Sequence, residues 1–102
     1  MIYDDTILRK ITNFSALQYS PERICFLIGL TGQEYDQLLA DIKTPDTEPN
    51  RAYNRGIAVG DYNIDAALMK ASESGDVMAE STLRERQDKR KIEDLKRELF
   101  GL

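Results

Sequence analysis

The chain has 102 residues, with 18 acidic side chains, 14 basic ones and no histidine, and its formal net charge at pH 7 is −4. This length allows one modest hydrophobic core or two small helical units, and it is too short for a large enzyme. Without histidine the chain lacks the commonest catalytic base and transition-metal ligand, and its glycines match no phosphate-binding loop. We therefore expect a protein that is not an enzyme and needs no cofactor or metal.

The sequence shows no sign of membrane insertion or export. No stretch approaches the length of a membrane-spanning helix, and the opening residues, MIYDDTIL, are acidic where a signal peptide is basic. The single cysteine, Cys25, lies in the apolar run ICFLIGL, which predicts a buried thiol rather than a reactive one. A lone cysteine also agrees with a reducing compartment. We expect a cytoplasmic protein without membrane contact, located in the bacterial host cytoplasm if it is viral.

The first predicted helix runs from about residue 4 to residue 17. Its apolar residues fall on one stripe at helical spacing, and its basic residues lie on the opposite side. The stripe consists of Ile7, Leu8, Ile11 and Phe14, and the outward residues include Arg9 and Lys10.

Two helix-start signals follow, separated by a glycine. Ser20 is placed to cap a helix that begins at Pro21, where the missing N–H of proline costs nothing. Thr31 and Glu34 have the spacing of a capping box. Gly29 lies between the two signals and provides the sharp turn. The pattern predicts a helix-turn-helix unit.

In DNA-binding proteins with this motif, the second helix lies in the major groove. Here the exposed face of that helix carries Gln33 and Gln37, which can each pair with adenine, but it carries no lysine or arginine. Residues 1–48 contain eight acids and four bases, so we expect binding by one copy to be weak. The predicted DNA-binding residues are Arg9, Lys10, Arg23, Gln33, Gln37 and Lys43. The alternative is a three-helix unit that packs in the same way and never contacts DNA.

The second half of the chain predicts a long antiparallel helical hairpin. Residues 44–50 are rich in proline and polar side chains and are interpreted as a linker between the unit of residues 1–43 and a hairpin over residues 51–91. Glycines at 56 and 60 would each weaken a helix by about 1 kcal/mol relative to alanine, which indicates close helix–helix approach. An apolar stripe on the first hairpin helix is longer than one short partner helix can cover, so it predicts self-association. The predicted oligomerisation residues are Tyr53, Ile57, Gly60 and Ile64.

The last segment, residues 92–102, is predicted to be a separate tail. The run RERQDKRK before it is typical of a solvated face. Leu83 and Ile92 are nine residues apart, which is two and a half helical turns, so the apolar residues of the tail face away from Leu83 unless the helix breaks between them. Leu95, Leu99 and Phe100 are the predicted anchors, which either dock to a partner protein or strap a neighbouring copy.

The order of these parts, with the segments AYNRG and ASESGDVMAESTLRER in the hairpin, resembles the small terminase subunits of tailed bacteriophages. The resemblance spans roughly residues 20–86. The hairpin positions that carry it are Tyr53, Gly56, Ala71, Gly75, Asp76, Ala79 and Leu83. It implies a ring-forming protein that binds double-stranded viral DNA through its first unit, oligomerises through the hairpin and contacts the large ATPase–nuclease subunit through its C-terminal segment.

The sequence therefore predicts an all-α protein with a three-helix helix-turn-helix unit, a long helical hairpin and a C-terminal tail. The predicted function is that of a non-catalytic DNA-packaging adaptor. Two alternatives stay open at this point: a dimeric helix-turn-helix transcription regulator, and a helical scaffold protein without DNA binding. A regulator is expected to be two-fold symmetric, whereas a packaging adaptor is expected to form a larger ring.

Overall fold

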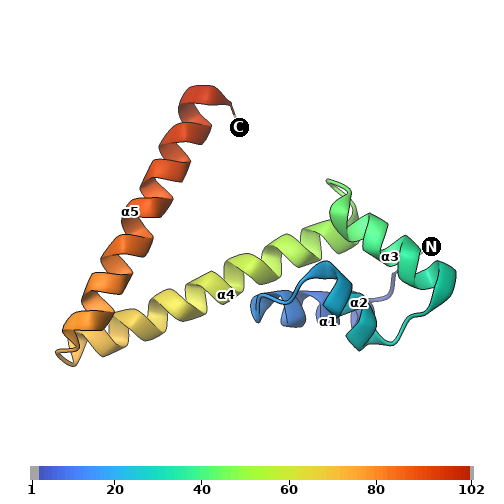
Figure 1. Ribbon diagram of the computed structural model, residues 1–102, viewed down its shortest axis with the longest axis horizontal. Coiled ribbons are helices and arrows are strands. Elements are labelled where there is room, and N and C mark those ends of the chain that lie inside the picture. Colours follow the sequence, from blue (N-terminus) through green and yellow to red (C-terminus); the bar gives the residue numbers. More distant parts are fainter. Residues whose placement is uncertain (1–2, 102) are drawn as a thin grey trace. The chain divides into compact units, whose positions relative to one another are not determined.

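The computed structural model describes residues 3–101, which form five helices and no strand. The helices are α1 (Asp5–Ala16), α2 (Pro21–Ile28), α3 (Gly32–Lys43), α4 (Glu48–Glu73) and α5 (Val77–Phe100), as labelled in Figure 1. The prediction of an all-α protein is confirmed for this part of the chain. None of these helices is long and apolar enough to cross a membrane. The chain divides into two compact units, Met1–Tyr62 and Asn63–Leu102, which are described separately.

Helix α1 matches its prediction to within one residue at each end. The carboxylate of Asp4 caps it by accepting a hydrogen bond from the N–H of Ile7 at 2.9 Å. Ile11 is completely buried, and the other residues of the predicted stripe pack around the same core. Arg9 and Lys10 are exposed on the opposite side, as predicted.

The local signals around α2 are confirmed, and one signal at the start of α3 is wrong. Ser20 accepts a hydrogen bond from the N–H of Arg23 at 3.2 Å, and Gly29 ends α2 in the left-handed region with φ +92°. Thr31 precedes α3 but makes no side-chain capping bond, so the predicted capping box is not formed. The first residue of α3, Gly32, has φ +60°, and this non-helical start leaves the threonine hydroxyl without the geometry that a capping box requires.

The core of the first unit lies between α1, α2 and α3. Its buried side chains are Tyr3, Ile11, Ile24, Cys25, Leu38 and Ile42. The start of α4 belongs to the same unit, because Ala52 and Tyr53 pack against this core. Burying these side chains is the main source of stability for the unit.

The segment predicted as a linker, residues 44–50, is a turn followed by the first residues of α4. Pro49 is buried, and the side-chain amide of Asn50 donates to the carbonyl oxygen of Ile42 at 2.8 Å. The hydroxyl of Thr47 accepts from the N–H of Asn50 at 3.1 Å. These contacts bind the segment to the first unit, which continues to Tyr62.

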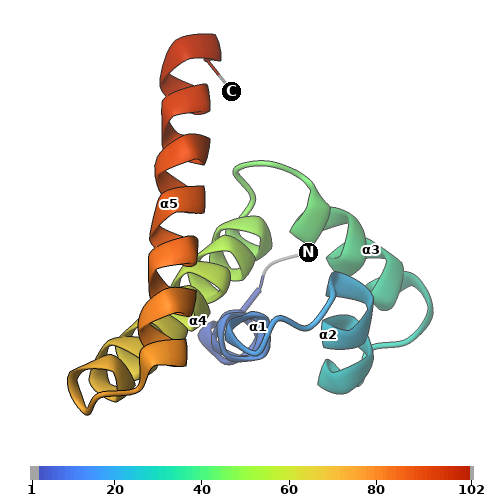
Figure 2. The same ribbon diagram turned by 60° about the vertical axis from the view of Figure 1, so that its left-hand side comes forward.

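The two helical glycines of α4 face α1. A Cβ atom on Gly56 would lie 1.7 Å from the hydroxyl oxygen of Ser15, and one on Gly60 would lie 2.3 Å from the carbonyl oxygen of Ala16. Figures 1 and 2 both show α1 lying alongside the first half of α4. The predicted close helix–helix approach is therefore present, and it occurs within one copy of the chain.

The same contact involves the predicted oligomerisation face. Tyr53 packs against the core of its own chain, and Gly60 is buried against α1. Ile57 is half-buried, and Ile64 is exposed. Helical spacing in a sequence reveals that a face makes contact, but it does not reveal whether the contacting surface lies in the same molecule.

The second unit consists of the last part of α4, the turn at Gly75 and helix α5. Asp76 caps α5 by accepting from the N–H of Ala79 at 3.0 Å. Near the turn, Ala79 and Leu83 are buried. Further along, the carboxylate of Asp65 accepts from Arg86 at 2.7 Å and pairs with Arg90 at 2.9 Å.

Helix α5 continues unbroken to Phe100, and no described residue after Leu83 is buried. Figures 1 and 2 show α5 diverging from the end of α4 after the turn. The apolar residues of the predicted tail are exposed: Ile92 by 54%, Leu95 by 53%, Leu99 by 67% and Phe100 by 70%.

Candidate nucleic-acid interface

The outer face of α3 is exposed. It consists of Gln33, Asp36, Gln37 and Ala40. The side-chain amide of Gln37 donates to the carboxylate of Asp41 at 3.1 Å. The hydroxyl of Tyr3 donates to the same carboxylate, and this hydrogen bond holds the pKa of Asp41 below its usual value. Gln37 therefore lies beside a stabilised negative charge. Gln33 makes no such hydrogen bond to Asp41.

Two of the predicted basic residues already have partners in the first unit. The ammonium of Lys43 lies 2.9 Å from the carboxylate of Glu22, which joins the end of α3 to the start of α2. Their hydrogen bond raises the pKa of Lys43 and lowers that of Glu22. The guanidinium carbon of Arg23 lies 5.5 Å from the centre of the Tyr19 ring, within the range of a cation–π contact. Phosphate binding by Lys43 would have to compete with the Glu22 carboxylate.

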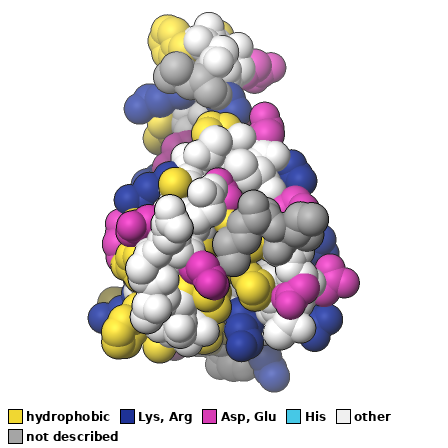
Figure 3. Space-filling model, turned by 90° about the vertical axis from the view of Figure 1, so that its right-hand side faces the viewer, with side chains coloured by type: hydrophobic (Ala, Val, Ile, Leu, Met, Phe, Trp, Pro, Cys, Tyr) yellow, Lys and Arg dark blue, Asp and Glu magenta, His cyan; other side chains and the backbone are white. Residues whose placement is uncertain are grey.

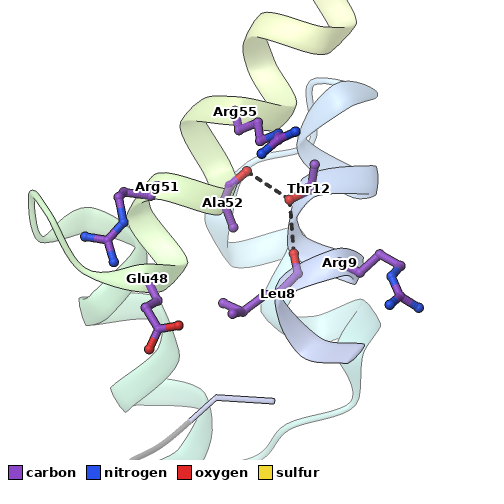
Figure 4. Close-up of a pocket in the computed structure, with 7 residues that line it drawn as sticks. All are labelled: Leu8, Arg9, Thr12, Glu48, Arg51, Ala52 and Arg55. Carbon is purple, nitrogen blue, oxygen red and sulfur yellow. Dashed lines mark hydrogen bonds between the residues drawn. The ribbon is translucent and has the colours of Figure 1, made fainter. Parts of the chain in front are cut away.

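Arg9 borders a groove between α1 and the start of α4 that sequence reasoning missed. The groove has a volume of about 550 Å³. It is lined by Leu8, Arg9, Thr12, Glu48, Arg51, Ala52 and Arg55. We call it the α1–α4 groove. Figure 4 shows Arg9 projecting from α1, and Arg51 and Arg55 projecting from α4.

The groove has a fixed base. The hydroxyl oxygen of Thr12 lies 3.1 Å from the carbonyl oxygen of Leu8 and 3.2 Å from that of Ala52, so its single proton is shared between α1 and α4. Both bonds are drawn in Figure 4. Arg51 and Arg55 were missed because the first unit was expected to end at residue 43. The signal that finds them is the spacing of Ala52 and Gly56, which sets the face of α4 that meets α1.

The first unit remains acidic with α4 included. Residues 1–62 contain nine acids and six bases. On the face drawn in Figure 3, acidic and basic side chains are interspersed, and no large area carries one sign of charge. Any nucleic-acid contact must therefore depend on a few local arginines rather than on the net charge of the unit.

Between residues 3 and 101, no group of three or more cysteine, aspartate or glutamate side chains could hold a metal ion. Cys25 is buried, and burial raises the pKa of its thiol to about 11. A thiol with such a pKa is almost wholly protonated at neutral pH, which makes it a poor nucleophile.

Exposed apolar side chains occur in both units. In the first unit, Phe26 is 76% exposed beside Leu27 and Tyr19 at a shallow hollow on α2, and Val59 and Tyr62 are exposed on α4. In the second unit the exposed apolar side chains on α4 and α5 are Ile64, Met69, Val77, Met78, Ile92, Leu95, Leu99 and Phe100. So much exposed apolar area on a small protein indicates contact with other molecules.

Comparison with known proteins adds no assignment, because no protein-family model, curated protein or solved structure matches the chain significantly.

Proposed function

We propose that this protein is a non-catalytic DNA-packaging adaptor of the small-terminase type, which binds double-stranded DNA through α2 and α3 acting as a helix-turn-helix. The observation that carries the proposal is the arrangement of α2, the left-handed Gly29 and α3 on one core, with the outer face of α3 exposed. Gln33 and Gln37 on that face would pair with bases. The packaging role itself rests on the resemblance in sequence.

The proposed adaptor acts as an assembly of many copies. One unit with nine acids and six bases binds DNA weakly, so several units must bind the same duplex for useful affinity. The exposed apolar residues of α4 and α5 supply the surface for self-association, and Ile64 is the member of the predicted set that remains exposed. In this proposal α4 and α5 form the oligomerisation arm as a helical hairpin, and their pairing is completed between copies.

The end of α5 is proposed to dock to the large terminase subunit. Leu95, Leu99 and Phe100 are more than half exposed, and charged residues surround them. An amphipathic helix of this kind binds an apolar groove of a partner through residues spaced three or four apart. The C-terminal segment would then connect the DNA-bound assembly to the motor.

A helical scaffold without DNA binding is the second candidate, and one observation favours it. Lys43 is paired with Glu22, and Gln37 is bonded to Asp41, so two of the six predicted DNA-binding side chains are held within the first unit. In a scaffold these bonds would serve stability alone.

Native mass spectrometry of the full chain, with and without a duplex of about 30 base pairs, tests the proposal. A packaging adaptor should give a closed oligomer larger than a dimer that retains the duplex. A dimer on one duplex would indicate a transcription regulator instead. An assembly of any size that never retains the duplex would support the scaffold and overturn the DNA-binding role.

A further inference from the structure

We infer that the α1–α4 groove is a binding site for the phosphate backbone of a nucleic acid, and that Arg9, Arg51 and Arg55 are its phosphate-binding residues. The inference rests on the proposed function for the identity of the ligand as duplex DNA. The arginine cluster itself follows from the structure alone.

The groove is locally positive within an acidic unit. Three arginines and one glutamate, Glu48, line it, so its side chains carry a net charge of +2. Arg51 also lies in the first turn of α4, where the helix dipole already makes the potential positive. Such a position is unfavourable for a cation in the isolated protein, and an anion bound there would relieve it.

The arginines of the groove are more available than Lys43 and Arg23, the predicted DNA-contacting bases that already have partners. Arg9 and Arg55 are exposed, and their guanidinium groups form no hydrogen bond or ion pair with any residue between 3 and 101. Arg51 donates from one nitrogen to the carbonyl oxygen of Asp46, which leaves its other N–H groups available. Lys43, by contrast, is paired with Glu22.

The arrangement fits a run of phosphates better than one small anion. The three side chains spread around the rim in Figure 4 instead of converging on one point. Thr12 bonds α1 to Ala52 of α4 beneath them, so the two helices fix the backbone positions from which the three arginines extend. A guanidinium group binds a phosphate through two parallel N–H bonds, and successive backbone phosphates would meet successive arginines.

Such contacts would position the protein on the duplex without reading its sequence. Phosphate contacts fix the register, whereas base contacts supply specificity. Helix α3 has no exposed arginine. Arginine contacts from α1 and α4 would therefore supply affinity for the duplex that α3 cannot supply.

The test compares two double variants of the full chain. Arg9→Gln/Arg55→Gln removes the two unbonded charges of the groove, and Lys70→Gln/Lys96→Gln removes two exposed charges from the second unit as the matched control. Circular dichroism and thermal unfolding first establish that both variants fold like wild type. Binding to several duplexes of different sequence is then measured by fluorescence anisotropy at a series of salt concentrations.

We expect the groove variant to bind every duplex at least about 10-fold more weakly than wild type. The factor should be similar for each duplex sequence. The slope of log K against log salt concentration should fall in magnitude by about 2, because two phosphate contacts are lost. The control should change affinity by less than about twofold. If the groove variant behaves like the control on a duplex that wild type binds, the inference is overturned while the proposed function stands.

A second probe separates failure of the groove from failure of DNA binding. Linear polyphosphate is titrated into the wild-type chain while the Nε–H signals of its arginines are followed by NMR. If no duplex binds but polyphosphate shifts the Arg9 and Arg55 signals ahead of those of Arg23 and Arg84, the proposed function fails and the groove stands as a polyphosphate-type anion site. If neither ligand shifts those two signals preferentially, the inference is overturned.

Discussion

Gly60 of α4 lies so close to Ala16 of α1 that a Cβ atom at residue 60 would be 2.3 Å from the Ala16 carbonyl oxygen. One turn earlier, a Cβ atom on Gly56 would be 2.3 Å from the carbonyl oxygen of Thr12. Both obstacles are backbone atoms of a helix, which cannot move aside like the end of a flexible side chain. The two glycines thus set the distance between α1 and α4, and with it the base of the α1–α4 groove.

Gly60→Ala should therefore destabilise the protein. In an ordinary helix this substitution stabilises by about 1 kcal/mol, but here the added methyl group forces α1 and α4 apart. We expect the free energy of unfolding to fall by about 1–3 kcal/mol, the usual cost of overpacking a core. Urea denaturation followed by circular dichroism measures this. Asn63→Ala, at an exposed position of the same helix, serves as the control, and a Gly60→Ala protein at least as stable as wild type would contradict the close packing.

Cys25 should resist a thiol reagent in the native protein and react at once in denaturant. Its side chain is fully buried, and burial raises the thiol pKa to about 11, so both access and ionisation are suppressed. The measurement is the rate of labelling at pH 8, with Cys25→Ser/Ser74→Cys as the exposed control on the same chain. Native labelling of Cys25 as fast as that of the control would mean that the α1–α2–α3 core is wrongly assigned.

The stability of the second unit should decrease in acid. The hydrogen bond from Arg86 is the largest cause that lowers the pKa of Asp65 below its usual value, followed by that from Arg90. A lowered pKa means that the unfolded state binds the proton first as the pH falls. The stabilisation is therefore present above the ordinary aspartate pKa of about 4 and is lost as the pH falls below it.

Asp65→Asn tests this dependence. We expect it to lower the free energy of unfolding at pH 7 by about 1 kcal/mol, since the carboxylate is only partly shielded from water, and to have little effect at pH 2. Thermal unfolding at the two pH values provides the comparison. An equal effect at both would show that the ion pairs do not contribute.

Gln33→Ala and Gln37→Ala should relax the preference for particular DNA sites, and Gln33→Ala should do so more. A bidentate glutamine–adenine pair discriminates by about 1–3 kcal/mol against the wrong base. Gln37 must first give up its 3.1 Å bond to Asp41, which reduces its net contribution. Competition between preferred and random duplexes measures the ratio of affinities. A uniform loss of affinity on every duplex would leave no support for base reading by α3.

The sequence predicted the features that depend on local chemistry and missed those that depend on which surfaces meet. The Ser20 cap, the left-handed Gly29 and the burial of Cys25 follow from nearby residues and are confirmed. Gly60 was correctly expected to allow close approach, but no local signal shows that its neighbour is Ala16 of the same chain. Arg51 and Arg55 were missed because the first unit was expected to end at residue 43, although the spacing of Ala52 and Gly56 marks the face of α4 that meets α1.

The spacing of apolar residues in the sequence also could not predict that α5 diverges from the end of α4. Leu83 and Ala79 are buried near the turn, whereas the polar run after Leu83 offers nothing apolar to continue that contact. Solvated charges on both helices remove the driving force for pairing further along, apart from the bonds of Asp65 to Arg86 and Arg90. The position of those two arginines one turn apart opposite one aspartate is a tertiary feature with no sequence signature.

Deleting residues 92–102 should leave the stability of a single copy almost unchanged. Leu95 and Leu99 are at least half exposed along an isolated stretch of α5, so their removal uncovers no core. The deletion decides between the two proposed roles of the tail. An assembly with an unchanged number of copies that no longer binds the large packaging subunit would support docking, and an assembly that falls apart would show that the tail straps neighbouring copies. The double variant Leu95→Glu/Leu99→Glu in the full chain keeps the helix and removes only its apolar face. It should therefore reproduce whichever outcome the deletion gives. If the variant behaves like wild type in both assembly and binding, the apolar stripe is not the contact surface.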